Sequence, residues 1–152
     1  MKTISIGLVV FLLCISVASA GASETDEEFT LVSAADLGYK IVPAKSTDGG
    51  DVGIRTVYST ITQGETNWHS FTISSDYTYI TVDLNWGDTS DSLKLYIYDP
   101  SNHCLGSFYD SADGSIDGRI HLNIIDNDGI EKGTWRYRVY GYSVTGTEDY
   151  SI

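Results

Sequence analysis

Two acidic turns carry the side chains best suited to bind a metal ion. Calcium prefers several oxygen ligands from acidic loops, and residues 88–91 (DTSD) and 126–131 (DNDGIE) form two such segments. Asp, Asn and Gly are also common turn formers, so chain reversal alone is the competing interpretation. If the protein uses a cofactor, we expect calcium, with four candidate ligands: Asp88, Asp91, Asp126 and Asp128.

The sequence contains no recognisable motif for hydrolytic catalysis. A nucleophilic mechanism needs Ser or Cys, a base and an orienting acid within hydrogen-bond reach. His69, His103 and His121 are the only histidines, and Ser70 and Cys104 each follow one directly. Neighbours on a strand point to opposite faces, so neither pair meets. The chain has no G-x-S-x-G, S-x-x-K or H-E-x-x-H motif. We therefore expect a protein without catalytic residues.

Aromatic and basic residues share the predicted outer faces of two strands. Tyr96 and Tyr98 lie on one, and Arg136, Arg138 and Tyr140 lie on the other. Tyr and Arg are enriched at recognition sites, although tyrosines also form simple cross-strand pairs on a solvated sheet. If the two strands are close to each other, these five residues form a surface for an extracellular protein or polysaccharide.

The composition limits the classes of partner. The chain has 152 residues, of which 41% are hydrophobic, and nine Lys/Arg against 21 Asp/Glu give a formal net charge of −12. This length fits one domain. So negative a charge argues against nucleic-acid binding, which requires basic residues to neutralise phosphates. It also disfavours docking on anionic lipid.

Residues 1–20 have the three parts of a secretory signal peptide. Lys2 provides the positive start, residues 4–17 are almost wholly apolar, and the small residues Ala18 and Ala20 mark a cleavage site. A retained anchor is the alternative, but the run is shorter than the ~20 residues that span a bilayer. We expect a secreted or cell-envelope protein with no membrane insertion after cleavage. Cys104 is then the only cysteine, so no intramolecular disulfide can form.

The rest of the chain divides into two parts. Residues 21–55 are an acidic leader and an N-terminal segment, in which residues 29–42 fit either a short strand or a helical turn. From residue 56 to 152, apolar and polar residues alternate between turn clusters, which indicates about seven or eight short strands. Strands with one dry face predict an all-β fold, an antiparallel, jelly-roll-like β-sandwich. The predicted inner face includes Phe71, Ile73, Leu93, Leu95, Ile97, Trp135, Tyr137 and Val139.

Three segments and the last strand occur in a familiar order: residues 64–73 (GETNWHSFTI), 93–100 (LKLYIYDP), 133–142 (GTWRYRVYGY) and 149–152 (DYSI). They are similar to the G-(D/E)-x-D-W-(F/Y)-x-F, D-L-x-L-Y-L-Y-D-P, G-T-Y-Y-V-R-V-Y-G-Y and Y-x-L segments of one family. The chain thus resembles the bacterial pre-peptidase C-terminal (PPC) domain, a β-sandwich module of secreted proteins. His69 stands where that family usually has an aromatic residue.

The resemblance implies an auxiliary role. Family members typically accompany a protease or another hydrolase, and some bind calcium and collagen; here the sequence predicts no attached catalytic domain. Calcium-binding members draw ligands from an acidic leader and from aspartates just before the W/Y-x-F strand. This chain has an acidic leader, but the second position offers only Glu65.

We therefore expect a secreted, non-catalytic accessory module, calcium-stabilised if the acidic turns bind metal, that recognises protein or polysaccharide. Two other classes stay open on the sequence. One is an extracellular hydrolase, or an inhibitor or chaperone-like partner of one. The other is a structural component of the cell envelope.

Overall fold

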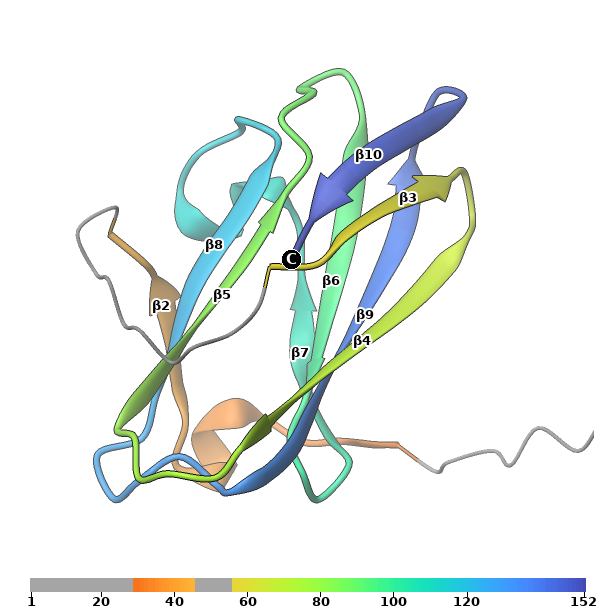
Figure 1. The fold of residues 1–152 in the computed structure, drawn as a ribbon. Helices are drawn as coiled ribbons and strands as arrows, with labels where there is room; N and C mark the ends of the chain where they lie inside the picture. The colour runs from red at the N-terminus through yellow and green to blue at the C-terminus, as the bar shows by residue number, and fades with distance from the viewer. Residues whose placement is uncertain (1–28, 46–55) are drawn as a thin grey trace, which may run out of the picture.

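Alternating side chains sort the strands into a buried side and an outward side. The computed structural model describes residues 29–45 and 56–152, and there the strands form two sheets packed face to face (Figure 1). The predicted all-β sandwich is confirmed. The predicted signal peptide, residues 21–28 of the acidic leader and residues 46–55 lie outside the described residues.

Each sheet has five strands. The first, sheet A, has the order β1 (Thr30–Leu31), β7 (His103–Phe108), β6 (Ser92–Tyr98), β9 (Gly133–Ser143) and β4 (Thr66–Ile73). The second, sheet B, has the order β2 (Lys40–Pro43), β8 (Arg119–Ile125), β5 (Tyr79–Asn85), β10 (Thr147–Ser151) and β3 (Tyr58–Thr62). Two short 3-10 helices complete the described elements: η1 (Ala34–Leu37) and η2 (Asp110–Asp113). None of the helices in these ranges is long and apolar enough to cross a membrane.

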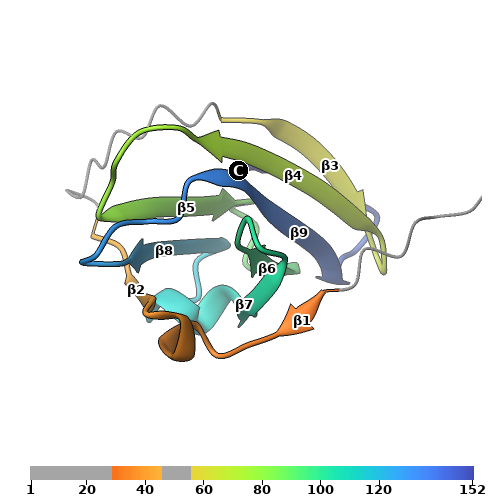
Figure 2. The ribbon, with the colours of Figure 1, turned by 90° about the horizontal axis from the view of Figure 1, so that it is seen from below.

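The sandwich begins before residue 56. β1 pairs in parallel with β7 and β2 pairs antiparallel with β8, so this N-terminal segment contributes an edge strand to each sheet (Figure 2). Residues 56–152 hold eight strands, β3 to β10, in agreement with the seven or eight predicted there, and β1 and β2 bring the described ranges to ten. The sequence could not decide between strand and helical turn for residues 29–42 because β1 has two residues, both exposed, and β2 ends in a proline.

Large aliphatic side chains and one tryptophan fill the space between the sheets. Leu95, Ile97 and Trp135 are completely buried, and the Trp135 Nε1–H donates a 2.9 Å hydrogen bond to the Glu131 carbonyl oxygen. Phe71 is only half-buried, against the edge of this core, because β4 is an edge strand. Most of the predicted inner face is therefore in the core.

His69 occupies the inward side of β4 as a half-buried ring. Its Nε2 lies 2.7 Å from the Tyr150 hydroxyl oxygen, and the two rings meet edge to face. Burial lowers the pKa of His69, because the charged imidazolium is poorly solvated there. The ring is therefore part of the inner face of sheet A.

In sheet B, backbone pairing is almost absent between the neighbouring strands β5 and β10. β10 pairs with β3 along five positions but with β5 only at Ser151 and Asn85, so the two strands diverge from that point (Figure 1). We call this divergence the β5–β10 seam. Successive β10 side chains point to opposite faces of sheet B. Side chains beside the seam therefore face either the core or the outer surface of the sheet.

The core predicts that two Leu→Ala substitutions differ strongly in their effect on the free energy of unfolding. Leu95→Ala should lower the free energy of unfolding by about 2–5 kcal/mol, because it leaves a cavity at a completely buried position. Leu31→Ala is the matched control, since Leu31 is 79% exposed, and it should change stability by no more than about 0.5 kcal/mol. Urea unfolding of both variants measures this, and equal losses would contradict the packing.

Candidate functional site

The register of sheet A brings the predicted recognition residues together. β9 lies between β6 and β4, so Arg138 pairs with Tyr96 on one side and with Trp68 on the other. In the rows beside it, Arg136 pairs with Tyr98, and Tyr140 pairs with Lys94. The five predicted residues thus share one outer face, as the sequence required of neighbouring strands. We call this surface the aromatic–basic face; it comprises Trp68, Lys94, Tyr96, Tyr98, Arg136, Arg138 and Tyr140.

Arg138 lies at the centre of this face. Its guanidinium carbon is 3.8 Å from the centroid of the Tyr96 ring and 5.8 Å from that of Trp68, which are cation–π distances. Its Nε is buried and has no hydrogen-bond partner, and no carboxylate of the described chain forms an ion pair with it. Aromatic rings, rather than an acid, therefore hold this charge in place.

Lys94 extends the basic surface toward two further tyrosines. Its Nζ lies 4.7 Å from the Tyr96 ring centroid and 4.9 Å from that of Tyr109. Hydrogen bonds to the Tyr96 and Tyr109 hydroxyls favour the ammonium form and raise the pKa of Lys94. The ring of Tyr142, which is half exposed, meets Tyr109 edge to face at 5.0 Å.

Tyr98 is packed into the protein rather than presented to solvent. It is 2% exposed, and the Phe29 ring lies 4.4 Å from it and also stacks on Trp68. Burial, followed by the neighbouring Cys104, raises the pKa of Tyr98 to about 12. Tyr98 thus lies on the outer face but is covered by Phe29, which corrects the expectation that it is a platform residue exposed to a ligand. Cys104 is buried, as a small apolar side chain would be.

The aromatic–basic face has a charge opposite to that of the whole chain. The protein has a formal net charge of −12. Yet the outward positions that pair across β4, β9 and β6 carry Lys94, Arg136 and Arg138 and no Asp or Glu. The described part of the molecule therefore has a local basic surface on one face of sheet A.

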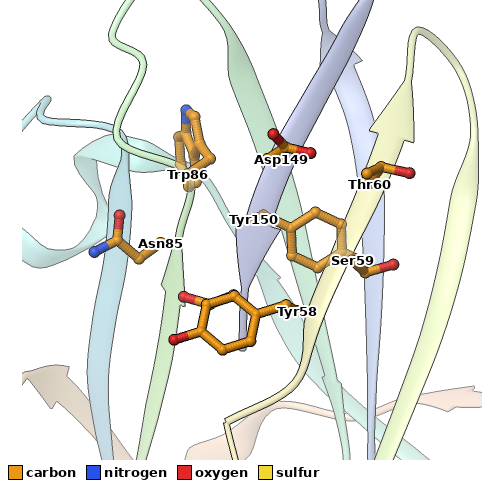
Figure 3. Close-up of a pocket in the computed structure, with 8 residues that line it drawn as sticks. Tyr58, Ser59, Thr60, Asn85, Trp86, Asp149 and Tyr150 are labelled. Carbon is orange, nitrogen blue, oxygen red and sulfur yellow. The ribbon is translucent and has the colours of Figure 1, made fainter.

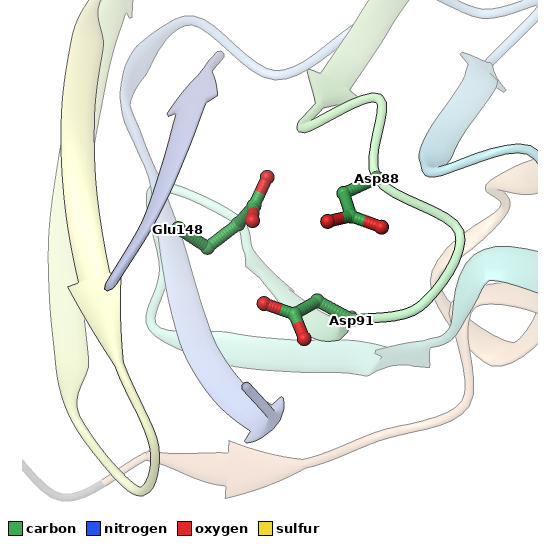
Figure 4. A group of neighbouring side chains, drawn as sticks. All are labelled: Asp88, Asp91 and Glu148. Atoms are coloured by element: carbon green, nitrogen blue, oxygen red, sulfur yellow. The ribbon is translucent and has the colours of Figure 1, made fainter. Parts of the chain in front are cut away.

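A separate group of acids lies beside the β5–β10 seam. One carboxylate oxygen each of Asp88, Asp91 and Glu148 lie within 4.8 Å of one another, and the three side chains point toward a common space (Figure 4). We call these residues the acidic trio. Asp88 and Asp91 come from the β5–β6 loop, as the sequence predicted, whereas Glu148 comes from β10.

The members of the acidic trio have different surroundings. Asp88 Oδ1 accepts hydrogen bonds from the Ser90 backbone N–H and hydroxyl, and these lower the pKa of Asp88. Asp91 Oδ1 accepts a 3.0 Å bond from the Thr145 N–H. Burial, followed by repulsion from Asp91 and Asp88, raises the pKa of Glu148.

The second predicted acidic turn lies apart from this group. Asp126 Oδ1 accepts a hydrogen bond from the Asp128 N–H, and the Asp126 carbonyl accepts one from Gly129. Within the described residues, neither Asp126 nor Asp128 belongs to a group of three potential metal ligands. The turn interpretation accounts for their contacts.

The Asp99–His103 pair also holds a turn. His103 Nδ1 lies 2.8 Å from Asp99 Oδ2, and the His103 backbone N–H donates to Asp99 Oδ1. Both carboxylate oxygens of this buried aspartate therefore close the β6–β7 connection. His69 contacts Tyr150 instead. The absence of catalytic function stays a prediction.

An open hollow of about 570 Å³ lies on the outer side of the seam (Figure 3). β3, β10 and the end of β5 line it, so it is on sheet B and not on the aromatic–basic face. Its lining residues are Tyr58, Ser59, Thr60, Asn85, Trp86, Asp149, Tyr150 and Ser151.

No family model matches the chain, and no curated protein matches it. The resemblance to the PPC family therefore stays a prediction from the quoted segments.

Glu148 should make stability depend on pH in metal-free buffer. Because its pKa is raised in the folded state, that state binds the proton more tightly than the unfolded chain does. The free energy of unfolding should therefore fall as pH rises from about 4.3, the ordinary Glu pKa, through the raised pKa of Glu148.

Glu148→Gln cannot titrate and should lose this part of the fall, while all other groups titrate as before. Urea unfolding between weakly acidic and neutral pH, in the presence of a chelator, measures the difference. The same slope in both proteins would show that Glu148 is not the responsible group.

Proposed function

We propose that the protein is a secreted, non-catalytic accessory module that binds an extracellular protein or polysaccharide through the aromatic–basic face. The observation that carries the proposal is Arg138. Its guanidinium is held 3.8 Å above the Tyr96 ring, beside Trp68, with no described acid to neutralise it. A fixed, unpaired arginine among aromatic rings is typical of the centre of a recognition surface.

The shape and charge of the surface indicate the kind of ligand. The face extends over β4, β9 and β6, and the hollow is on the other sheet, so an extended chain fits it better than a small molecule. Lys94, Arg136 and Arg138 favour acidic groups on that chain. Secretion is supported by the signal-peptide pattern of residues 1–20. We therefore expect an acidic polymer outside the cell to be the ligand.

The proposal predicts which variants lose binding. Polygalacturonate, heparin and polyglutamate serve as acidic probes, and neutral dextran serves as the comparison. Arg138→Gln and Tyr96→Ala should each weaken binding of a responding acidic probe by about tenfold or more, as loss of a central contact does. Isothermal titration calorimetry measures the affinity, and circular dichroism checks that each variant is folded.

Two variants on sheet B are matched controls. Arg119 forms a bidentate pair with Asp83, and Tyr58 is 82% exposed. Arg119→Gln and Tyr58→Ala should leave binding unchanged. The proposal is wrong if no acidic probe binds better than dextran, or if the controls weaken binding as much as the variants of the face.

A further inference from the structure

We propose that the acidic trio is a site for a hard divalent cation, with calcium as the expected ion, and that the bound ion joins β10 to the β5–β6 loop. This inference is independent of the proposed function, since the trio lies beside the β5–β10 seam of sheet B and the aromatic–basic face belongs to sheet A.

The geometry suits a single ion. Calcium binds carboxylate oxygens at about 2.3–2.6 Å, so two ligands on opposite sides of one ion lie about 4.6–5.2 Å apart. The nearest oxygens of the three carboxylates lie within 4.8 Å of one another. All three point into the same space (Figure 4), so one ion can reach them together.

Glu148 provides an observation beyond the clustering of acids. It is only 9% exposed, and its carboxylate is aimed at Asp88 and Asp91 (Figure 4). No N–H, hydroxyl, Lys, Arg or His in the described chain donates to its carboxylate, and the charged groups that act on it are all acids, Asp91, Asp88 and Asp149. A buried carboxylate is costly unless a donor or a cation compensates it.

The other buried acids show how this chain compensates a carboxylate. Asp110 accepts hydrogen bonds from three consecutive backbone N–H groups, those of residues 117–119. Asp99 accepts from the backbone and ring of His103. Glu148 has no such partner, so a ligand of positive charge is the missing compensation.

The two aspartates are held in place for coordination. Ser90 donates to Asp88 Oδ1, and the Thr145 N–H donates to Asp91 Oδ1. Each side chain is thus oriented by one oxygen, and this restriction lowers the entropic cost of binding an ion. All the ligands are oxygens, which hard cations prefer over nitrogen or sulfur.

The location gives the ion a structural role. β10 pairs with β5 only at Ser151 and Asn85, and Glu148 lies on the part of β10 that has already diverged. An ion held by Glu148 and the β5–β6 loop would connect the two segments where backbone pairing is missing. Glu65, the acid that the family pattern suggested, accepts from Thr62 in the β3–β4 turn and lies outside the trio.

A shared proton is the competing explanation. Burial and repulsion from Asp91 raise the pKa of Glu148, so a proton shared between the two carboxyls would also relieve their repulsion. The two explanations differ in the effect of calcium: a cation site is stabilised by calcium and loses this stabilisation in Glu148→Gln, whereas a shared-proton pair is not stabilised by calcium.

Terbium luminescence tests the site on the purified protein after treatment with a chelator. The Trp86 Nε1–H donates to the Asp91 carbonyl oxygen at 3.3 Å, so this indole is next to the trio and can sensitise a bound Tb³⁺ ion. We expect sensitised emission that calcium displaces, with a calcium dissociation constant of about 10⁻⁴–10⁻³ M, as in other extracellular modules. Saturating calcium should raise the melting temperature by about 5 °C or more.

Glu148→Gln should weaken calcium binding by about tenfold or more, since it removes a charged ligand of nearly unchanged shape. Asp128→Asn is the matched control and should bind as the unmodified protein does, because Asp128 lies outside the trio. Magnesium, tested in parallel, should bind more weakly, since it requires shorter and more regular coordination.

Three results would overturn the proposal. The first is that calcium neither displaces terbium nor raises the melting temperature. The second is that Glu148→Gln binds calcium as well as Asp128→Asn does. The third is that Glu148→Gln melts above the unmodified protein in chelator while calcium stabilises neither, which is the shared-proton outcome.

Discussion

Burial of one side of every strand is the constraint on which the rest of the structure depends. The two sheets press aliphatic side chains together, and a core of this kind contributes most of the stability of a domain that has no disulfide in its described part. Because side chains alternate along a strand, the same constraint directs every second residue outward. Leu95 and Ile97 point inward, so Lys94 and Tyr96 must face solvent.

The outward positions of sheet A gain their properties from pairing across strands. Alone, Arg138 would be one more solvated cation on β9. Between β4 and β6 it lies over the Tyr96 ring and near Trp68, and its position is restricted without an acidic partner in the described chain. A charge held in this way is available to a ligand, and this availability is the physical basis of the proposed binding role.

Sheet B has its unusual features where strand pairing fails. The seam between β5 and β10 leaves the hollow on the outer side and brings the acidic trio together next to it. Elsewhere in the described chain, buried Asp99 and Asp110 are satisfied by N–H donors four to nine residues away along the chain. Glu148 faces only other carboxylates, so the seam combines missing backbone pairing with uncompensated negative charge.

The all-β fold was predictable from sequence because the pleat of a strand is local: apolar residues at every second position show which side is dry. The same local rule placed Tyr96, Arg136, Arg138 and Tyr140 on outward positions. The acidic composition of one turn identified Asp88 and Asp91 as a pair of candidate ligands.

The pairing of distant strands determined which residues became neighbours, and the alternation within a single strand carries no information about this. Only the tertiary structure shows that β9 lies between β4 and β6, that Phe29 covers Tyr98, and that Glu148 completes a group with two aspartates far from it along the chain. Which strands become neighbours depends on the packing of the whole core, and no periodicity within a segment records it.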